Sequence, residues 1–280
     1  MCDESVGGCA RSLGSQEASV MRNRLIGSLA MSATILAFSF AALPGSAQRP
    51  AEAKAPAPVP KRDLSGVWQL QGYGGAESPA PEKDMPPMTP WAQARFDAEK
   101  PGYGSRAVPD GNDPILQCDP AGFPRIMYLP MPFEFVQAPG RLLQFFEREH
   151  EWRSIWTDGR PLPEDPDPKW YGYAIGHWED DYTFVTEAAG FNDRTWLGAT
   201  GYPHSEEMRV RERYQRVAHD TLLYNSTIDD PKAYSRPIVG PQRTFKLRPK
   251  AEIEELVCVW SEENAFAKRI REPAAAPPPK

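Results

Sequence analysis

A succession of short strand-like segments joined by turn residues constrains the fold of this chain more than any other feature. The stretch 170–178 is rich in strand-forming residues and is followed by the turn Glu179-Asp-Asp and a returning segment at 182–187. The stretch 208–217 is followed in the same way by Ala218-His-Asp and a return at 221–228. Because strand formers bounded by turn residues predict β-hairpins, we expect both pairs to be antiparallel.

The same pattern continues on either side of these hairpins, and one helix precedes it. Thr89 followed by Pro90 predicts a short helix that ends before Pro101, because Thr caps a helix N-terminus and Pro suits its first position. A meander of many strands closes to remove its edges. The predicted fold class is therefore all-β: an antiparallel, up-and-down, barrel-like (calycin-like) meander with one short N-terminal helix and long loops. The other predicted strands are 63–70, 133–137, 141–146, 152–156, 242–247 and 253–260.

The N-terminal segment predicts export. Basic residues follow Met21, an apolar run covers 25–43, and small residues stand at 45–47. These are the three parts of a signal peptide, although a transmembrane anchor is the alternative. We interpret 1–20 as a start codon assigned too early and 21–47 as the signal peptide. The expected location is periplasmic or secreted, with no stable membrane anchor after processing.

Beyond the leader at 1–47, composition divides the chain into a linker, a folded domain and a tail. Proline and alanine dominate 48–62, which predicts an extended linker, and a similar composition at 272–280 predicts a disordered tail. The residues between them, 63–271, are enough for a single β-barrel domain with one core. The sequence leaves the oligomeric state open.

Two cysteines, Cys118 and Cys258, remain once the leader is removed. In an oxidising compartment an even number of cysteines favours a disulfide, so we expect these two to be joined. The alternative is a pair of separate buried thiols.

Several short motifs are distributed along the predicted domain: Trp156-Thr-Asp-Gly-Arg, Gly176-His-Trp-Glu, Gly190-Phe-Asn-Asp-Arg-Thr-Trp-Leu, Pro203-His-Ser, Glu212-Arg-Tyr-Gln-Arg-Val and Ile228-Asp-Asp-Pro-Lys-Ala-Tyr. Together they resemble a broad family of secreted bacterial proteins. The likeness covers most of 63–260 and implies a shared fold and export, but it carries no activity that can be transferred. Gly198 stands where the family has an acid, so no acid-dependent role is assigned to that position.

Glu212 is the first candidate for chemistry. At the two-residue period of a strand, Met208, Val210, Glu212 and Tyr214 share one face, and three arginines share the other. A carboxylate on the apolar face must be paired, hydrogen-bonded or shifted in pKa. Its structural alternative is a buried Glu satisfied by an Arg or Tyr of another strand. Tyr214 is a candidate for substrate binding.

The long loop 190–205 holds the other candidates. His204 is free to reach a pocket there, and imidazole is the natural proton carrier at neutral pH. Asp193 could orient it and Arg194 could bind a polar group, although both could equally be turn residues. Aromatic residues crowd this half of the domain and most are expected in the core, but Trp196 and Tyr202 are predicted to wall a ligand.

Four prolines between Pro161 and Pro168 predict a stiff, extended loop. Such a loop separates two groups of strands or covers a mouth of the barrel.

Several classes of function lack support. A net charge of −6 without a basic cluster speaks against nucleic acid as a partner. His177, His204 and His219 do not have the spacing of a common metal motif, so no metal site is predicted, although one could assemble in space. There is no Gly-x-Ser-x-Gly and no phosphate-cradling glycine motif, so no cofactor is expected.

These observations predict an exported β-barrel with a small-molecule pocket at one mouth. In the enzyme interpretation, His204 carries a proton, Glu212 or Asp193 is its partner, and Arg194 binds an anion or carbonyl group. The reaction would be general acid–base chemistry of the lyase or isomerase type on an aromatic or hydrophobic compound. The alternatives are a non-catalytic periplasmic ligand-binding protein and a module that contacts another exported protein.

Overall fold

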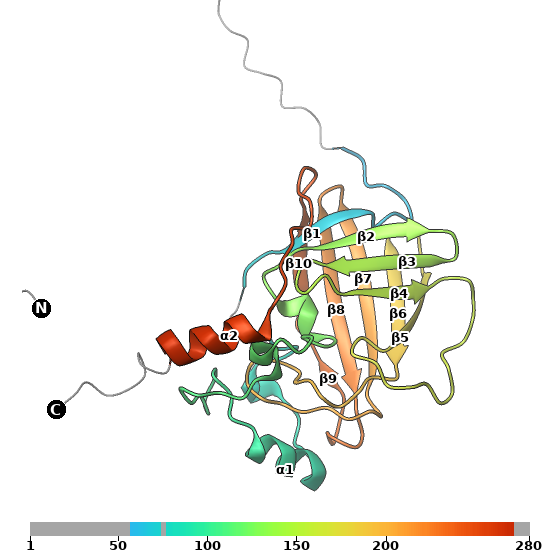
Figure 1. Cartoon of the computed structure of the whole chain (residues 1–280). Coiled ribbons are helices and arrows are strands. Elements are labelled where there is room, and N and C mark those ends of the chain that lie inside the picture. Colours follow the sequence, from blue (N-terminus) through green and yellow to red (C-terminus); the bar gives the residue numbers. More distant parts are fainter. Residues whose placement is uncertain (1–56, 74–76, 272–280) are drawn as a thin grey trace, which may run out of the picture. The chain divides into compact units, whose positions relative to one another are not determined.

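The computed structural model describes residues 57–73 and 77–271, which belong to one compact unit (Figure 1). The predicted leader at 1–47, most of the predicted linker at 48–62 and the tail at 272–280 lie outside the described residues. Within them, no helix combines the length and the apolar composition needed to cross a bilayer. The strands are β1 (Gly66–Leu70), β2 (Phe133–Ala138), β3 (Arg141–Phe146), β4 (Trp152–Trp156), β5 (Tyr173–Trp178), β6 (Thr183–Ala189), β7 (Arg209–Ala218), β8 (Thr221–Asp229), β9 (Ile238–Val239) and β10 (Arg243–Leu247).

The strands form a closed, mostly antiparallel barrel. Its order is β10-β1-β2-β3-β4-β5-β6-β7-β8, and the ring closes because β10 also pairs with β8. The short strand β9 pairs with the far end of β8. The predicted β-barrel meander is therefore confirmed, including the hairpins β5–β6 and β7–β8.

One step of the barrel differs from the prediction. Strands β4 and β5 run parallel and pair only at Ile155 with Ala174 and at Trp156 with Ile175. The expectation of a wholly antiparallel sheet was therefore wrong here. Parallel neighbours need a crossover of about a dozen residues or more, and the proline-rich loop 157–172 makes that connection (Figure 1).

The crossover is held against the outside of the barrel at its far end. The Lys169 amide donates to the Gly190 carbonyl at 2.9 Å, and the Asn192 amide donates to the Lys169 carbonyl at 2.9 Å. Gly190 has a φ of +74°, and a Cβ there would lie 2.6 Å from Cγ of Pro166. Glycine at 190, directly after β6, therefore allows Pro166 of the loop to pack closely against the end of that strand.

Helix α1 agrees with the sequence prediction, whereas one predicted strand near the C-terminus is not formed. Helix α1 begins where predicted, since the Thr89 side chain accepts a hydrogen bond from the Ala92 amide and Pro90 takes the first position. The predicted strand 253–260 is wrong. Both neighbours of β10 are already strands of the ring, so the barrel offers no free edge beside it. The helical elements are α1 (Pro90–Ala98), α2 (Trp260–Phe266), the 3₁₀ turns η1 (Glu82–Asp84), η2 (Pro114–Gln117) and η3 (Arg125–Tyr128), and the π-helical turn η4 (Ala267–Arg271).

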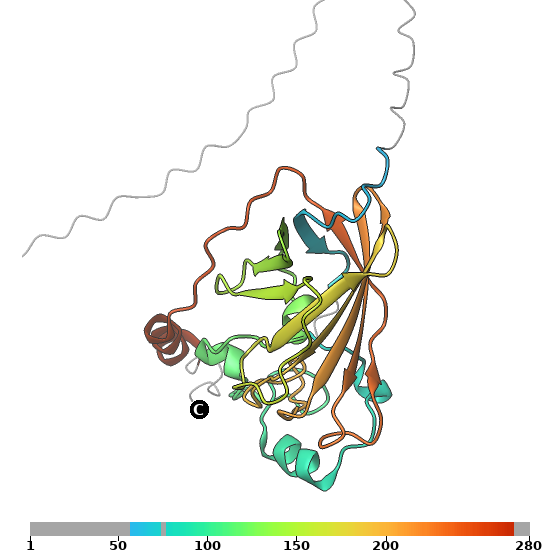
Figure 2. The same cartoon turned by 90° about the vertical axis from the view of Figure 1, so that its right-hand side faces the viewer.

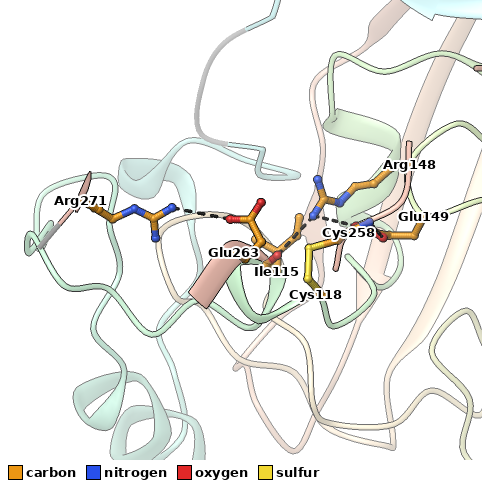
Figure 3. Close-up of a disulfide and its surroundings, with 7 residues drawn as sticks. All are labelled: Ile115, Cys118, Arg148, Glu149, Cys258, Glu263 and Arg271. Atoms are coloured by element: carbon orange, nitrogen blue, oxygen red, sulfur yellow. Dashed lines mark hydrogen bonds and ion pairs between the residues drawn. A yellow bond between two sulfur atoms is a disulfide. The ribbon is translucent and has the colours of Figure 1, made fainter. Parts of the chain in front are cut away.

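Beyond β10 the chain runs down the outside of the barrel to α2 (Figure 2). A disulfide joins Cys118 to Cys258 in this segment, with Cα atoms 5.4 Å apart and a sequence separation of 140, so the predicted bridge is confirmed. The Cys258 amide also donates to the Glu149 carboxylate at 2.8 Å, and Arg148 forms an ion pair with that carboxylate at 3.2 Å (Figure 3). The disulfide fastens the segment to the end of η2, and the hydrogen bond to Glu149 fastens it to the turn between β3 and β4.

The interior of the barrel is filled with side chains, many of them aromatic. Phe133 packs edge-to-face on Phe245 with ring centroids 5.1 Å apart. The segment around η3 enters this core, where the Tyr128 hydroxyl bonds the Ser226 hydroxyl of β8 at 2.7 Å and the Met127 sulfur accepts from Gln144 of β3 at 3.2 Å. A packed interior directs the search for a ligand site to the outside of the barrel.

Candidate functional site

Glu212 lies inside the barrel, on the buried face of β7 as predicted. Arg153 of β4 donates from Nη2 to both of its carboxylate oxygens, at 2.9 and 2.8 Å. Thr186 of β6 donates to the same carboxylate at 2.6 Å, and the Tyr214 hydroxyl donates to it as well. The carboxylate is therefore satisfied by other strands, which was the structural alternative for this residue.

Arg153 is the centre of this buried network. Its Nε donates to Gln144 at 2.8 Å, and its guanidinium lies 3.8 Å from the ring centroid of Phe123. Burial by itself lowers the pKa of Arg153, but Glu212 outweighs it and raises that pKa above its usual value, so the group is charged. The pKa of Tyr214 is raised well above its usual value by burial and then by Glu212. The network is a charged pair with a neutral phenol beside it.

His204 belongs to a different part of the molecule. Its side chain is buried, and its Nε2 lies 2.7 Å from the Thr195 hydroxyl. Burial lowers its pKa below the usual 6.5, an effect that Asp230 partly offsets. Because its described partners are Thr195 and the Ser205 carbonyl, the structure does not bring His204 to Glu212.

The remaining candidates of the long loop also have separate partners. Asp193 pairs with Arg95 of α1 at 2.9 Å, at the surface. Trp196 is buried, and Tyr202 is buried against Phe96 with ring centroids 4.7 Å apart. These two rings are packed between elements of the protein rather than presented to a ligand.

Outside the barrel, a cavity of about 1170 Å³ lies between the crossover loop and strands β4 and β5. It follows from the parallel step, because the two strands share only two paired positions and the loop passes over them. Trp152 at its rim is 53% exposed, so the cavity opens to solvent. Of the predicted site residues, only Arg194 lines it.

Aromatic rings and cations alternate along the cavity wall. Arg160 lies 3.6 Å from the ring centroid of Trp156, Lys169 lies 4.0 Å from that of Tyr173, and Arg194 lies 4.5 Å from that of Trp170. Cations over ring faces attract the ring quadrupole by about 0.5–1 kcal/mol where the pair is exposed. The wall thus combines apolar surface with fixed positive charge.

The charge of this wall is unbalanced. It contains the cations Arg141, Arg160, Lys169 and Arg194 but only one acid, Glu164. Arg153 also borders the cavity, but its guanidinium points into the barrel and pairs there with Glu212. Two of the four cations have carboxylate partners from outside the wall: Asp158 for Arg160 at 2.5 Å, and Asp119 for Arg194 at 3.8 Å. Among the described residues, no carboxylate forms an ion pair with Arg141 or Lys169.

Sequence reasoning missed most of this site. It interpreted the aromatic residues around β4 and β5 as core, whereas the alternation of β4 places Trp152, Ser154 and Trp156 on its outer face. The run of prolines was the signal that something covers the strands, but nothing in it showed which face. In the described part of the chain, no cluster of His, Cys, Asp or Glu side chains has an arrangement suited to a metal ion.

Comparison of the sequence with models of known protein families and with curated proteins found no match. The geometry of the site therefore carries the functional argument.

The buried ion pair gives a prediction about stability. Replacing Arg153 with Met or Glu212 with Gln leaves one partner buried without its counterpart, which costs about 3–5 kcal/mol of the free energy of unfolding. The double variant Arg153→Met, Glu212→Gln loses less than the sum of the two single losses. Urea denaturation measures these values, with exposed Arg211→Gln on β7 as a control expected within about 0.5 kcal/mol of wild type. Losses below 1 kcal/mol in both single variants would contradict this description.

The buried imidazole predicts a pH dependence. Since the folded pKa of His204 lies below 6.5, the unfolded chain takes up the proton first as the pH falls. The stability contributed by neutral His204 is complete above pH 6.5 and falls by up to about 1.4 kcal/mol per pH unit below it, until the folded pKa is reached. Unfolding at pH 7.5, 6.5 and 5.5 should show a shallower acid loss in His204→Gln than in wild type or in the exposed control His177→Gln. Parallel slopes in all three proteins would rule out this role.

Proposed function

We propose that this chain is an exported β-barrel protein that binds a small molecule with an aromatic or hydrophobic body in the cavity beside β4 and β5. The cavity of about 1170 Å³ walled by Trp156, Trp170 and Tyr173 carries this proposal. Ligand pockets typically have volumes of about 300–1,000 Å³ and apolar, aromatic walls with a few polar groups. This cavity can therefore hold a drug-sized compound, including a compound that consists of two linked rings.

Binding without catalysis fits the geometry better than acid–base chemistry. A proton carrier must lie within hydrogen-bonding reach of the group on which it acts, and neither His204, Glu212 nor Asp193 lines the cavity. Each of the three is already bonded to a neighbour in the protein. The lyase or isomerase interpretation thus has no converging set of groups to carry it, and the ligand-binding alternative takes its place.

Two observations support export. The leader predicted at 21–47 has the parts of a signal peptide. The Cys118–Cys258 disulfide belongs to an oxidising compartment such as the periplasm or the cell exterior. Both agree with the resemblance of the motifs to secreted bacterial proteins, which we retain as part of the proposal.

The likeness to calycins extends to the barrel but not to the position of the ligand. Small barrels such as lipocalins hold one small ligand inside. In this chain Arg153, Glu212 and the aromatic side chains around them occupy the interior, and our proposal therefore puts the ligand on the outer face of β4 and β5.

Fluorescence of the neutral reporter N-phenyl-1-naphthylamine tests the proposed site. We expect saturable binding to one site, weakened about tenfold by Trp156→Ala and by Trp170→Ala, which corresponds to about 1.4 kcal/mol of lost contact per ring. Trp260→Ala is the matched control, because Trp260 is 49% exposed on α2 and does not line the cavity. Equal affinities in all four proteins, or no saturable binding, would refute a ligand site at this place.

A further inference from the structure

We propose that the ligand of this cavity is an anion whose carboxylate lies beside the face of a ring, and that Arg141, Lys169 and Arg194 recognise the carboxylate. The inference rests on the proposed function, since it assigns a chemical class to the compound bound at the same site. It follows from the charge of the wall and from the way the cations are held.

The charge of the wall favours an anion. Four cations and one acid present their charges to the cavity, and Arg141 and Lys169 have no described carboxylate partner. Arg194, the third cation assigned to the carboxylate, lies 3.8 Å from its partner Asp119, which is beyond the usual length of a hydrogen bond. A ligand carboxylate would therefore supply the counter-charge that the protein does not.

The cations are also held in place before a ligand arrives. Arg141 lies 5.5 Å from the ring centroid of Trp156, Lys169 lies 4.0 Å from that of Tyr173, and Arg194 lies 4.5 Å from that of Trp170. A guanidinium stacked on a ring keeps its in-plane N–H groups free, in the fork geometry that matches a carboxylate. Because less side-chain freedom is lost on binding, such a pair binds an anion better than a free surface cation does.

Two kinds of compound offer a carboxylate beside a ring face. One is an aromatic carboxylate, whose flat ring can stack on tryptophan. The other is a uronic acid saccharide, whose pyranose ring presents an apolar face to the same tryptophans. The wall recognises what the two share, so both are compared in the test.

The test uses calorimetric titration of the full mature chain with two probes of equal shape. 2-Naphthoate carries the carboxylate, and 2-naphthylmethanol replaces it with a neutral group. We expect naphthoate to bind at least tenfold more tightly, with an affinity that falls as salt is added because exposed charges are screened. Digalacturonate and its dimethyl ester form the second pair, and the pair with the larger charge preference identifies the source of the ligand.

Matched variants locate the effect. The double variant Arg141→Gln, Lys169→Gln should remove most of the preference for the anion and leave binding of the neutral member unchanged. The double variant Arg209→Gln, Arg211→Gln is the control for the loss of two charges, since both residues lie on β7 and neither lines the cavity. A preference retained in the double variant would overturn the assignment of these residues.

The result also separates this inference from the proposed function. If the neutral and charged members bind equally and the reporter still responds to the tryptophan variants, the cavity is a ligand site but the ligand is not an anion. If neither probe pair nor the reporter binds, both proposals fail. A charge preference in either pair, lost in the double variant, supports the inference.

Discussion

The parallel step between β4 and β5 is the constraint on which the rest of the site depends. Two strands that run in the same direction cannot be joined by a tight turn, so the chain must return along the outside of the barrel. The crossover 157–172 does this without a helix, because four prolines keep it extended and remove the N–H groups that a helix needs. A loop that stands off two briefly paired strands leaves space beneath it, and that space is the cavity.

The packing of the interior explains why that space matters. Arg153 reaches across from β4 to Glu212 on β7, and Gln144, Thr186 and Tyr214 complete the bonding of the pair. A buried pair of this kind is stable only while every member keeps its partners, so the interior does not open for a ligand. The inner face of β4 is thus committed to the core, and its outer face, with Trp152 and Trp156, borders the proposed site.

Much of the fold could be predicted from the sequence, because alternation and turn residues are local signals. The hairpins, the cap at Thr89, the buried face of β7 and the disulfide were all predicted in this way. The direction of β5 was not, since a strand has the same pattern whichever way it runs. The segment 253–260 has strand-forming residues but makes only an isolated bridge, between Leu256 and Arg148, because the closed ring leaves no edge beside β10 for a further strand. Glu212 and His204 were both recognised as unusual, but their partners Arg153 and Thr195 depend on tertiary contacts that spacing does not reveal.

Hydrogen–deuterium exchange with and without saturating N-phenyl-1-naphthylamine tests the central claim, that the ligand site lies outside the barrel at the β4–β5 step. The account predicts that the probe slows exchange in peptides covering 152–156 and 169–175. Peptides covering 196–208, which include Trp196, Tyr202 and His204, should exchange at the same rate in both samples. Slower exchange in 196–208 with no change in 152–156 and 169–175 would contradict the account and return the site to the long loop.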